Sequence, residues 1–418
     1  IIQNGNMCEL DLPLKFAQKL YNEFAIRHPN AFYLRTRQRG MQNWDGKIHY
    51  ITKTGQFKIG LLPKVYDMCI EMGIKPKVVD MRQPLPKVSK VVTNIGKYKL
   101  RPEQEKAVKA VINNKIGNTP FHIGVLDYTV NAGKTLIMSS LYLSYKKQLK
   151  TLLITNDSDW LNQAREEFKQ YLPGEDITFV QGKVLNWSNF TIGMVQSISR
   201  NMRFYQKELS QIDMVLIDEA DQGGSKQYQN VITRLFNTRI RIGLSGTIYM
   251  SKLAKDRVKN MNLECFFGKV IAEFKLKDSI KKGYSTKTVV KMVPGKPWYG
   301  NWESDCISYK EIYDDSITNC YTAWLMAYNR LLWNLNQGRY PALVVCKHIA
   351  HCENLYKFFK KKLGDAYNIA YVHVNTPSKL RQQIMKDFRE GKIDILVSTT
   401  IIARGKNFPK LRYLLNAA

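Results

Sequence analysis

The segment at residues 128–135, which reads Tyr-Thr-Val-Asn-Ala-Gly-Lys-Thr, constrains the fold of this chain more than any other. An apolar run precedes it at residues 121–126, and a run with helical character follows it at residues 136–145. A phosphate-binding loop requires this order of strand, turn and helix, because backbone N–H groups and the helix dipole then converge on the anion. In such a loop Lys134 binds the β- and γ-phosphates of a nucleotide, and the Thr135 hydroxyl holds Mg²⁺.

Two residues depart from the usual G-x-x-x-x-G-K-[ST] pattern. Tyr128 stands where a small residue is usual, and Asn131 lies in the middle of the loop. We predict that the backbone of Asn131, Ala132 and Gly133 lines the nucleotide. A Gly-Lys-Thr sequence also occurs by chance at the start of a helix, so the interpretation depends on the strands that follow.

The charge of the chain points to a polyanionic partner. Its 418 residues include 64 Lys and Arg against 35 Asp and Glu, a net charge of +29. A field of that sign favours nucleic acid first and an anionic membrane surface second. No apolar stretch approaches the roughly 18–20 residues that span a bilayer, and residues 1–20 do not form a signal peptide. We therefore expect a cytoplasmic protein.

Residues 1–95 are predicted to form a small α+β domain that binds nucleic acid. The pattern favours a helix at residues 14–26, strands at 47–52 and 57–62, and a helix at 65–72. Residues 76–97 contain three prolines and are predicted to be a linker.

A further strand is predicted at residues 33–39, where alternate side chains share one face. Arg35, Arg37 and Arg39 then form a basic stripe, and Trp44 and Lys47 follow in the next turn. Arginine binds phosphate through a bidentate fork, so we predict that these five residues contact nucleic acid. The alternative is a structural cap whose charges are merely solvated.

Residues 96–275 alternate between apolar strands and helical segments, which predicts a parallel sheet with helices on both faces. Ligands of such sheets bind at the carboxyl ends of the strands, where the loop at 128–135 falls. The strand at 214–217 ends in Asp218-Glu219-Ala-Asp. In a phosphate-loop ATPase an Asp at this place holds Mg²⁺ through water, and the adjacent Glu polarises the attacking water. The alternative is a strand that ends in a solvated acidic turn.

Together these segments resemble the motor of superfamily 2 helicases and translocases. Gln104, after Leu-Arg101-Pro, resembles the glutamine that reads adenine, with Arg101 beside the nucleotide. The resemblance implies contacts to the nucleic-acid backbone from Thr155, Gln196 and Ser197. It implies coupling of hydrolysis to strand movement by Ser245, Gly246 and Thr247.

Residues 276–335 are predicted to be a connector with an insertion. We expect a helix at residues 275–283, a strand at 284–293 and a long helix at 312–334. Trp298 and Trp302 lie in the turn-rich insertion, where they either stack on bases or pack on a neighbouring helix.

Residues 336–418 are predicted to form a second α/β layer without its own phosphate loop. It resembles the second motor domain of the same superfamily, and the resemblance implies roles for particular residues. Nucleic-acid contacts fall on Lys347, His348, Thr399 and Thr400, and a nucleotide contact falls on Gly405. Asn407 stands where an Asp is usual. The arginine-bearing motif of the family would come after residue 418, so we expect the C-terminal part of this domain to be missing from the sequence.

The predicted fold class is therefore α/β, with two RecA-like parallel-sheet motor domains in tandem after a small α+β domain. The Asn-Trp-Asp-Gly-Lys turn at residues 43–47 is similar to that of the UvsW-type phage recombination helicases. This resemblance implies an ATP- and Mg²⁺-dependent helicase or translocase that acts on branched or forked DNA in recombination, repair or replication. We expect the protein to be a monomer.

Three alternatives stay open at this point. One is an RNA helicase of the same superfamily, and another is the motor portion of a restriction or nuclease complex. The third is a non-catalytic nucleic-acid-binding scaffold, which the intact Lys134, Asp218 and Glu219 disfavour.

Overall fold

The chain divides into two compact units, Ile1–Thr288 and Val289–Ala418. The computed structural model describes residues 1–37, 41, 43–145, 148–182, 184–249, 256–287, 289–292, 308–402 and 408–417. The predicted site residues Arg39 and Gly405, together with Asn407, Trp298 and Trp302, lie outside the described residues.

An eight-stranded sheet forms the centre of the first unit. Its strands are parallel except at one edge, where β12 runs antiparallel to β11. The spatial order is β12 (Val184–Leu185), β11 (Ile177–Gln181), β13 (Phe190–Met194), β10 (Thr151–Thr155), β14 (Met214–Asp218), β15 (Ile240–Ser245), β9 (His122–Tyr128) and β16 (Val270–Phe274). The parallel sheet predicted from the alternation of strands and helices is thus confirmed.

Helices cover both faces of this sheet, and each face has its own apolar core. One face carries α4 (Pro102–Ile112), α5 (Lys134–Ser144) and α6 (Ser158–Tyr171). The other carries α7 (Val195–Arg200), α8 (Gln206–Ser210), α9 (Lys226–Ile232) and α10 (Arg257–Phe267). After β16 the chain forms the short helix α11 (Leu276–Lys281), which was also predicted. Two small hairpins, β5 (Asn94–Ile95) with β6 (Tyr98–Lys99) and β7 (Lys115–Ile116) with β8 (Thr119–Pro120), complete the unit.

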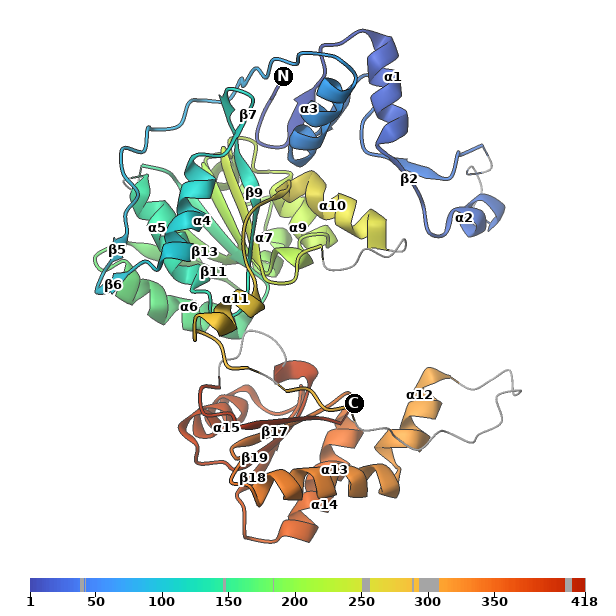
Figure 1. Cartoon of the computed structure of the whole chain (residues 1–418), viewed down its shortest axis with the longest axis vertical. Coiled ribbons are helices and arrows are strands. Elements are labelled where there is room, and N and C mark those ends of the chain that lie inside the picture. Colours follow the sequence, from blue (N-terminus) through green and yellow to red (C-terminus); the bar gives the residue numbers. More distant parts are fainter. Residues whose placement is uncertain are drawn as a thin grey trace. The chain divides into compact units, whose positions relative to one another are not determined.

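The N-terminal segment folds as a small α+β module on the α10 side of the sheet (Figure 1). Buried Leu20 and Val65 of the module belong to the same apolar core as Phe266 of α10. Its elements are β1 (Met7–Glu9), α1 (Leu14–Glu23), β2 (Ala25–Arg27), α2 (Ala31–Arg37), β3 (Lys47–His49), β4 (Gln56–Lys58), the 3-10 turn Ile59–Leu61 and α3 (Leu62–Glu71). β1 pairs with β4, and β2 pairs with β3.

The strand predicted at residues 33–39 is wrong, because α2 occupies most of it. A strand needs a neighbour for its backbone groups, whereas α2 pairs its own and buries only Ala31. Successive helical residues are about 100° apart, so Arg35 and Arg37 point to nearly opposite sides of α2. The predicted basic stripe does not form.

Two predictions in the connector are also corrected. Residues 284–287 and 289–292 form no strand. The long helix predicted at 312–334 is broken into α12 (Tyr309–Tyr313), a π-helical turn (Asp314–Thr318) and α13 (Tyr321–Leu335). The Trp324 indole donates to the carbonyls of Ile317 and Thr318, at 3.2 and 3.1 Å, and so satisfies backbone groups that the break leaves open.

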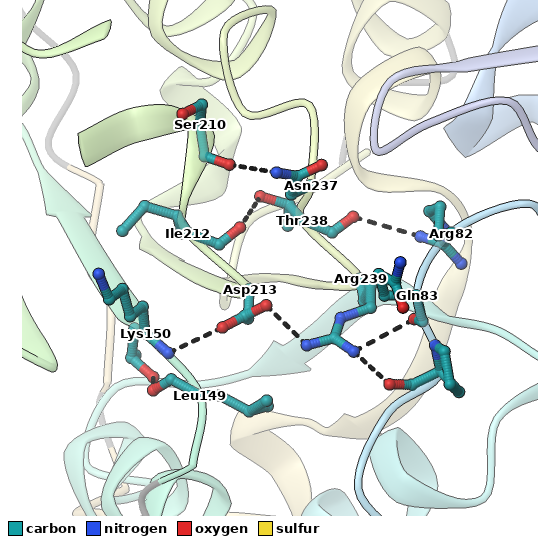
Figure 2. A network of polar contacts seen from close by, with 12 residues as sticks. Arg82, Gln83, Leu149, Lys150, Ser210, Ile212, Asp213, Asn237, Thr238 and Arg239 are labelled. Carbon is teal, nitrogen blue, oxygen red and sulfur yellow. Dashed lines mark hydrogen bonds and ion pairs between the residues drawn. The ribbon is translucent and has the colours of Figure 1, made fainter. Parts of the chain in front are cut away.

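The predicted linker is fixed to the amino ends of the central strands. The Arg239 guanidinium donates to the backbone carbonyl of Gln83 at 3.1 Å and to Asp213 Oδ1 at 2.6 Å (Figure 2). Asp213 also accepts from the backbone N–H of Lys150 at 3.0 Å, and Arg82 donates to the Thr238 carbonyl at 3.3 Å. The linker therefore follows a defined path along the sheet.

One buried arginine joins the N-terminal module to the sheet. Arg241 on β15 is 0% exposed and donates to the Gly5 carbonyl at 2.6 Å and Asn6 Oδ1 at 2.7 Å. It also donates to the Phe266 carbonyl at 3.1 Å. Burial lowers the pKa of Arg241 to about 9, so the guanidinium is still charged at neutral pH. Its hydrogen bonds therefore hold residues 5–6 directly on β15.

The second unit is a smaller α/β layer. Its four parallel strands are, in spatial order, β18 (Ile369–Val372), β19 (Ile395–Thr399), β17 (Ala342–Cys346) and β20 (Tyr413–Asn416). Helices α13 and α14 (Ile349–Leu363) pack on one face, and α15 (Ser378–Glu390) packs on the other. This fold agrees with the second α/β layer predicted for residues 336–418. Within the described residues, no helix is long and apolar enough to cross a membrane.

Replacing Arg241 by alanine should destabilise the first unit by at least about 2 kcal/mol, because each buried acceptor left unpaired costs about 1–3 kcal/mol. Urea and thermal unfolding would measure the loss. Arg203, which is exposed, is the matched control, and its alanine variant should stay close to the parent protein. Equal stabilities of the two variants would contradict a structural role for Arg241.

Candidate nucleotide-binding site

The loop between β9 and α5 has the backbone of a phosphate-binding turn. Gly133, at φ 74°, caps α5, which begins at Lys134. Asn131 has φ 64° and is also left-handed. Asparagine is among the few side chains that adopt this region readily, which accounts for its presence where a glycine is usual.

Tyr128 belongs to the strand and not to the loop. It is the last residue of β9, its side chain is fully buried, and its hydroxyl donates to the Glu103 carbonyl at 2.8 Å. Burial raises the pKa of Tyr128 to about 12, so this hydroxyl keeps its proton at neutral pH. A small residue is not needed at this position, because the side chain is buried and hydrogen-bonded to the backbone of α4.

Gln104 and Arg101 hold the loop from the side of α4. The Gln104 side chain, 1% exposed, donates to the Ala132 carbonyl at 2.9 Å and accepts from the Arg101 N–H at 2.8 Å. Arg101 in turn donates to the Asn131 carbonyl at 3.1 Å. A Cβ atom at Gly133 would lie 2.2 Å from Gln104 Nε2. The structure thus brings together the predicted nucleotide-contacting residues of the first unit.

Sequence reasoning missed a second group beside Arg101. The Arg101 guanidinium lies 4.2 Å from the ring centre of Tyr284. Glu103 forms an ion pair with Lys282 at 2.8 Å. Burial alone would raise the pKa of Glu103, but Lys282 and the nearby backbone hold it below its usual value. Lys282 and Tyr284 follow α11 with no recognisable motif, so no signal in the sequence marked them.

The predicted catalytic carboxylate lies opposite the loop lysine. Asp218 ends β14, is 4% exposed, and has its Oδ1 atom 3.3 Å from Lys134 Nζ. Within the described part of the chain, that buried oxygen accepts no hydrogen bond. A buried carboxylate oxygen with spare capacity beside an ammonium group suits a site for Mg²⁺ and phosphate. Glu219 follows with φ 52°, which is a strained conformation for a glutamate. Strained residues of this kind are found most often at functional sites.

The third strand end contacts the other two. The Ser245 hydroxyl donates to Asp221 Oδ1 at 3.0 Å and accepts from the Thr247 N–H at 3.1 Å. A Cβ atom at Gly246 would lie 3.0 Å from Thr129 Cα, so this turn packs directly on the start of the phosphate loop. A movement of the phosphate loop would therefore reach Ser245 and Asp221 through directly packed residues.

Three predicted nucleic-acid contacts of the first unit lie on the adjacent strands β10 and β13 and just after them. The Thr155 hydroxyl is buried and accepts from the Asp157 N–H at 3.2 Å. Gln196 donates to the Asn156 carbonyl at 3.2 Å, and Ser197 accepts from the Gly182 N–H at 2.9 Å. The three side chains shape the loops at this edge, and a direct contact to nucleic acid stays a prediction.

The predicted contacts of the second unit lie at the carboxyl ends of paired strands. Lys347 and His348 follow β17, and Thr399, which is buried, and Thr400, which is exposed, lie at the end of β19. The Lys347 ammonium donates to the Tyr309 hydroxyl at 2.9 Å and lies 4.2 Å from its ring centre. Tyr309, which is 65% exposed, was not predicted.

Two known families match separate parts of the chain. Residues 97–250 match the family described as type III restriction enzyme, res subunit, and residues 325–418 match the helicase conserved C-terminal domain. The chain is 33% identical over 89 residues to the ATP-dependent RNA helicase RhlB of Shewanella woodyi, over 21% of this chain and 20% of that protein. It is 22% identical over 215 residues to the ATP-dependent RNA helicase CHR1 of Candida albicans, over 50% of this chain and 31% of that protein. The matches therefore span a third or less of the curated relatives' own length.

Solved structures share the fold over more of the chain. The crystal structure of UvsW from bacteriophage T4 matches 99% of this chain and 82% of its own, with a TM-score of 0.51 and 19% identity. A second T4 UvsW helicase structure matches 65% of this chain and 97% of its own, with a TM-score of 0.51 and 21% identity. At this identity the likeness concerns the fold, and it confirms the prediction of two RecA-like domains in tandem.

Alanine at Gly133 should weaken nucleotide binding at least about tenfold, because its Cβ atom would push Gln104 out of the loop and strain a left-handed backbone. Titration with a fluorescent ATP analogue would measure the loss. Gly174 is a matched control, since it has φ 82° and a Cβ atom placed there would meet nothing within 4 Å. If G174A and G133A bind nucleotide equally well, crowding at the loop is not the cause.

Proposed function

We propose that this chain is a superfamily 2 helicase that uses ATP hydrolysis to move along branched DNA and to unwind or migrate the branch. The observation that carries the proposal is the convergence of Gln104, Lys134 and Asp218 on one turn at the carboxyl edge of the sheet. The Lys134 ammonium lies 3.3 Å from Asp218 Oδ1, and the Gln104 side chain holds the loop carbonyl of Ala132 at 2.9 Å.

Each residue of the first unit has a defined task in this proposal. Lys134 would bind the terminal phosphates, and the Thr135 hydroxyl and Asp218 would hold Mg²⁺. The metal neutralises phosphate charge when it is bound. Glu219 orients the attacking water, and Arg101 with Gln104 holds the nucleotide base. The backbone of Asn131, Ala132 and Gly133 surrounds the phosphates.

Coupling of hydrolysis to movement is assigned to the turn at Ser245, Gly246 and Thr247. Ser245 binds Asp221, three residues after the metal-binding Asp218, at 3.0 Å. Gly246 packs on the opening of the phosphate loop. The turn therefore contacts Asp221 and the start of the phosphate loop. In the proposal, both of these respond to the γ-phosphate. Thr155, Gln196 and Ser197 of this unit and Lys347, His348, Thr399 and Thr400 of the second unit would grip the nucleic-acid backbone.

DNA as the substrate is supported by the Asn-Trp-Asp-Gly-Lys turn at residues 43–47 of the N-terminal module, which is similar to that of the UvsW-type phage recombination helicases. The likeness of fold to T4 UvsW extends over 99% of this chain and so includes the module. The net charge of +29 favours a grip on phosphates, which is independent of sequence and weakens steeply with salt.

An RNA helicase is the second candidate, because the curated relatives RhlB and CHR1 are named RNA helicases. The match of residues 97–250 to the restriction-subunit family keeps a motor within a nuclease complex as the third.

Lys134→Ala should abolish ATP hydrolysis and leave nucleic-acid binding within about twofold, since the lysine faces phosphate and not the strand. A phosphate-release assay and fluorescence anisotropy would measure the two. Lys169→Ala on the exposed surface of α6 is the matched control and should keep full activity. Retained turnover in K134A would remove the loop from the active site.

The substrate class is tested by ATPase stimulation with four ligands of equal length. We expect forked or four-way DNA to stimulate hydrolysis more than single-stranded DNA, blunt duplex DNA or RNA. Stimulation by RNA alone would replace the proposal by the second candidate. Stimulation by none of the four would favour a motor that needs a partner.

A further inference from the structure

The N-terminal module contains a cavity of about 550 Å³ next to α2. Arg27 of β2, Lys47 of β3 and Arg35 of α2 line it, together with Phe32 and Asp45. Sites for small organic ligands have volumes of about 300–1,000 Å³. This cavity therefore has the size for one nucleotide-sized group.

The cations around the cavity are arranged at a cost to the fold. Arg27 and Lys47 are direct partners in the antiparallel β2–β3 pair. Like charges at facing positions destabilise a sheet, because their side chains start only about 4.5–5.5 Å apart. Within the described residues, no salt bridge joins Arg27, Arg35 or Lys47 to a carboxylate. A bound anion would relieve this repulsion.

Asp45 is the one carboxylate among the described residues that line the cavity, and it is already engaged. Asp45 Oδ1 accepts from the Lys47 N–H at 2.9 Å, and Oδ2 lies 2.6 Å from His49 Nε2. These two contacts hold the pKa of Asp45 below its usual value. Asp45 therefore shapes the turn that presents Lys47. Gly46, at φ 76°, lets α2 approach this turn, since a Cβ atom at this position would lie 3.2 Å from Ala31 Cβ.

An aromatic ring stands at the same cavity. Phe32 is 80% exposed, and its neighbour Tyr33 is 54% exposed. Exposed rings beside a basic groove are the means by which proteins bind single strands, because unpaired bases stack on the ring while cations follow the phosphates. A paired base within a duplex keeps its faces covered by its neighbours and cannot use Phe32 in this way.

We propose that this cavity binds one unpaired nucleotide of a single strand, with its base on Phe32 and its phosphates among Arg27, Arg35 and Lys47. The inference rests on the proposed function, which it deepens by naming the part of a branch that the module holds. Unpaired bases occur where strands part, so the module would mark the branch point for the motor. The shared chemistry is a single-stranded nucleotide, of DNA or of RNA.

The ring is tested by fluorescence anisotropy of the full chain, without ATP, on oligo-dT, oligo-rU and blunt duplex DNA. Phe32→Ala should weaken binding to the single strands about 5–150-fold, the equivalent of losing one stacked base at about 1–3 kcal/mol. Binding to duplex should change less than about twofold, and Phe32→Tyr should restore the single-strand affinity. Phe204, 78% exposed and far along the chain, supplies the matched control F204A.

The cations are tested by the salt dependence of oligo-dT binding. Each phosphate contact to a single strand adds about 0.7 to the slope of log affinity against log salt, so Arg35→Ala with Lys47→Ala should lower it by about 1.4. Lys15→Ala with Lys19→Ala removes the same charge from exposed positions on α1 and should leave the slope unchanged. Thermal unfolding of each variant checks that the module stays folded.

The outcomes separate this inference from the function beneath it. If the parent protein binds no nucleic acid, the proposed function fails. If it binds and F32A binds single strands equally well, or the paired cation variants have equal slopes, the cavity assignment fails. Equal losses on duplex and single strand would also overturn it. Full displacement of oligo-dT by an acidic peptide of equal charge would assign the cavity to a protein partner.

Discussion

The parallel pairing of β9, β15 and β14 is the constraint on which the candidate active site depends. Their register places Asp127 beside Ser245, and Leu244 beside Asp218. Three loops therefore leave one edge of the sheet side by side, although they lie far apart in the sequence. The Lys134–Asp218 pair, the Ser245–Asp221 hydrogen bond and the approach of Gly246 to Thr129 all follow from this pairing.

β15 carries a second connection at its opposite end. Arg241, four residues before Ser245, is hydrogen-bonded to Gly5 and Asn6 of the N-terminal module. Strand β15 thus connects two places. The turn at its carboxyl end contacts the phosphate loop, and Arg241 near its amino end holds the N-terminal module. The linker strengthens the connection, because Arg82 and Arg239 fasten it to the neighbouring strand ends. The module is built as part of the first unit and not as a freely tethered attachment.

Periodicity of apolar residues predicted most of this architecture, because buried parallel strands leave continuous apolar runs whose ends are chemically distinct. The runs before Thr129 and Glu219 are of that kind, and both became central strands. The exposed segment at residues 33–37 carries no such signal. Its alternating arginines imitate a strand, but local hydrogen bonds and the burial of Ala31 make it a helix.

Site residues could be predicted from the sequence where a motif fixes both the residue type and its spacing. Residues that join the site only through a contact in the folded chain could not be predicted. Lys134, Gln104 and Asp218 were predicted from their motifs, and the structure brings them to one turn. Tyr284 and Tyr309 escaped notice, because a ring placed beside an arginine or a lysine has no fixed spacing in sequence. Tyr128 and Asn131 depart from the usual loop pattern, and the structure explains both. Tyr128 is hydrogen-bonded to the Glu103 carbonyl, and Asn131 has a positive φ.

The helical conformation of α2 changes how the N-terminal module can hold a strand. A flat strand with three arginines on one face would follow the phosphates of a duplex and read nothing else. A helix turns Arg35 toward Lys47 and Arg27, and exposes Phe32 beside them. The surface beside α2 is therefore concave. It has room for one nucleotide and offers the Phe32 ring to its base. In the proposed role, such a surface would distinguish an unpaired nucleotide from a paired one.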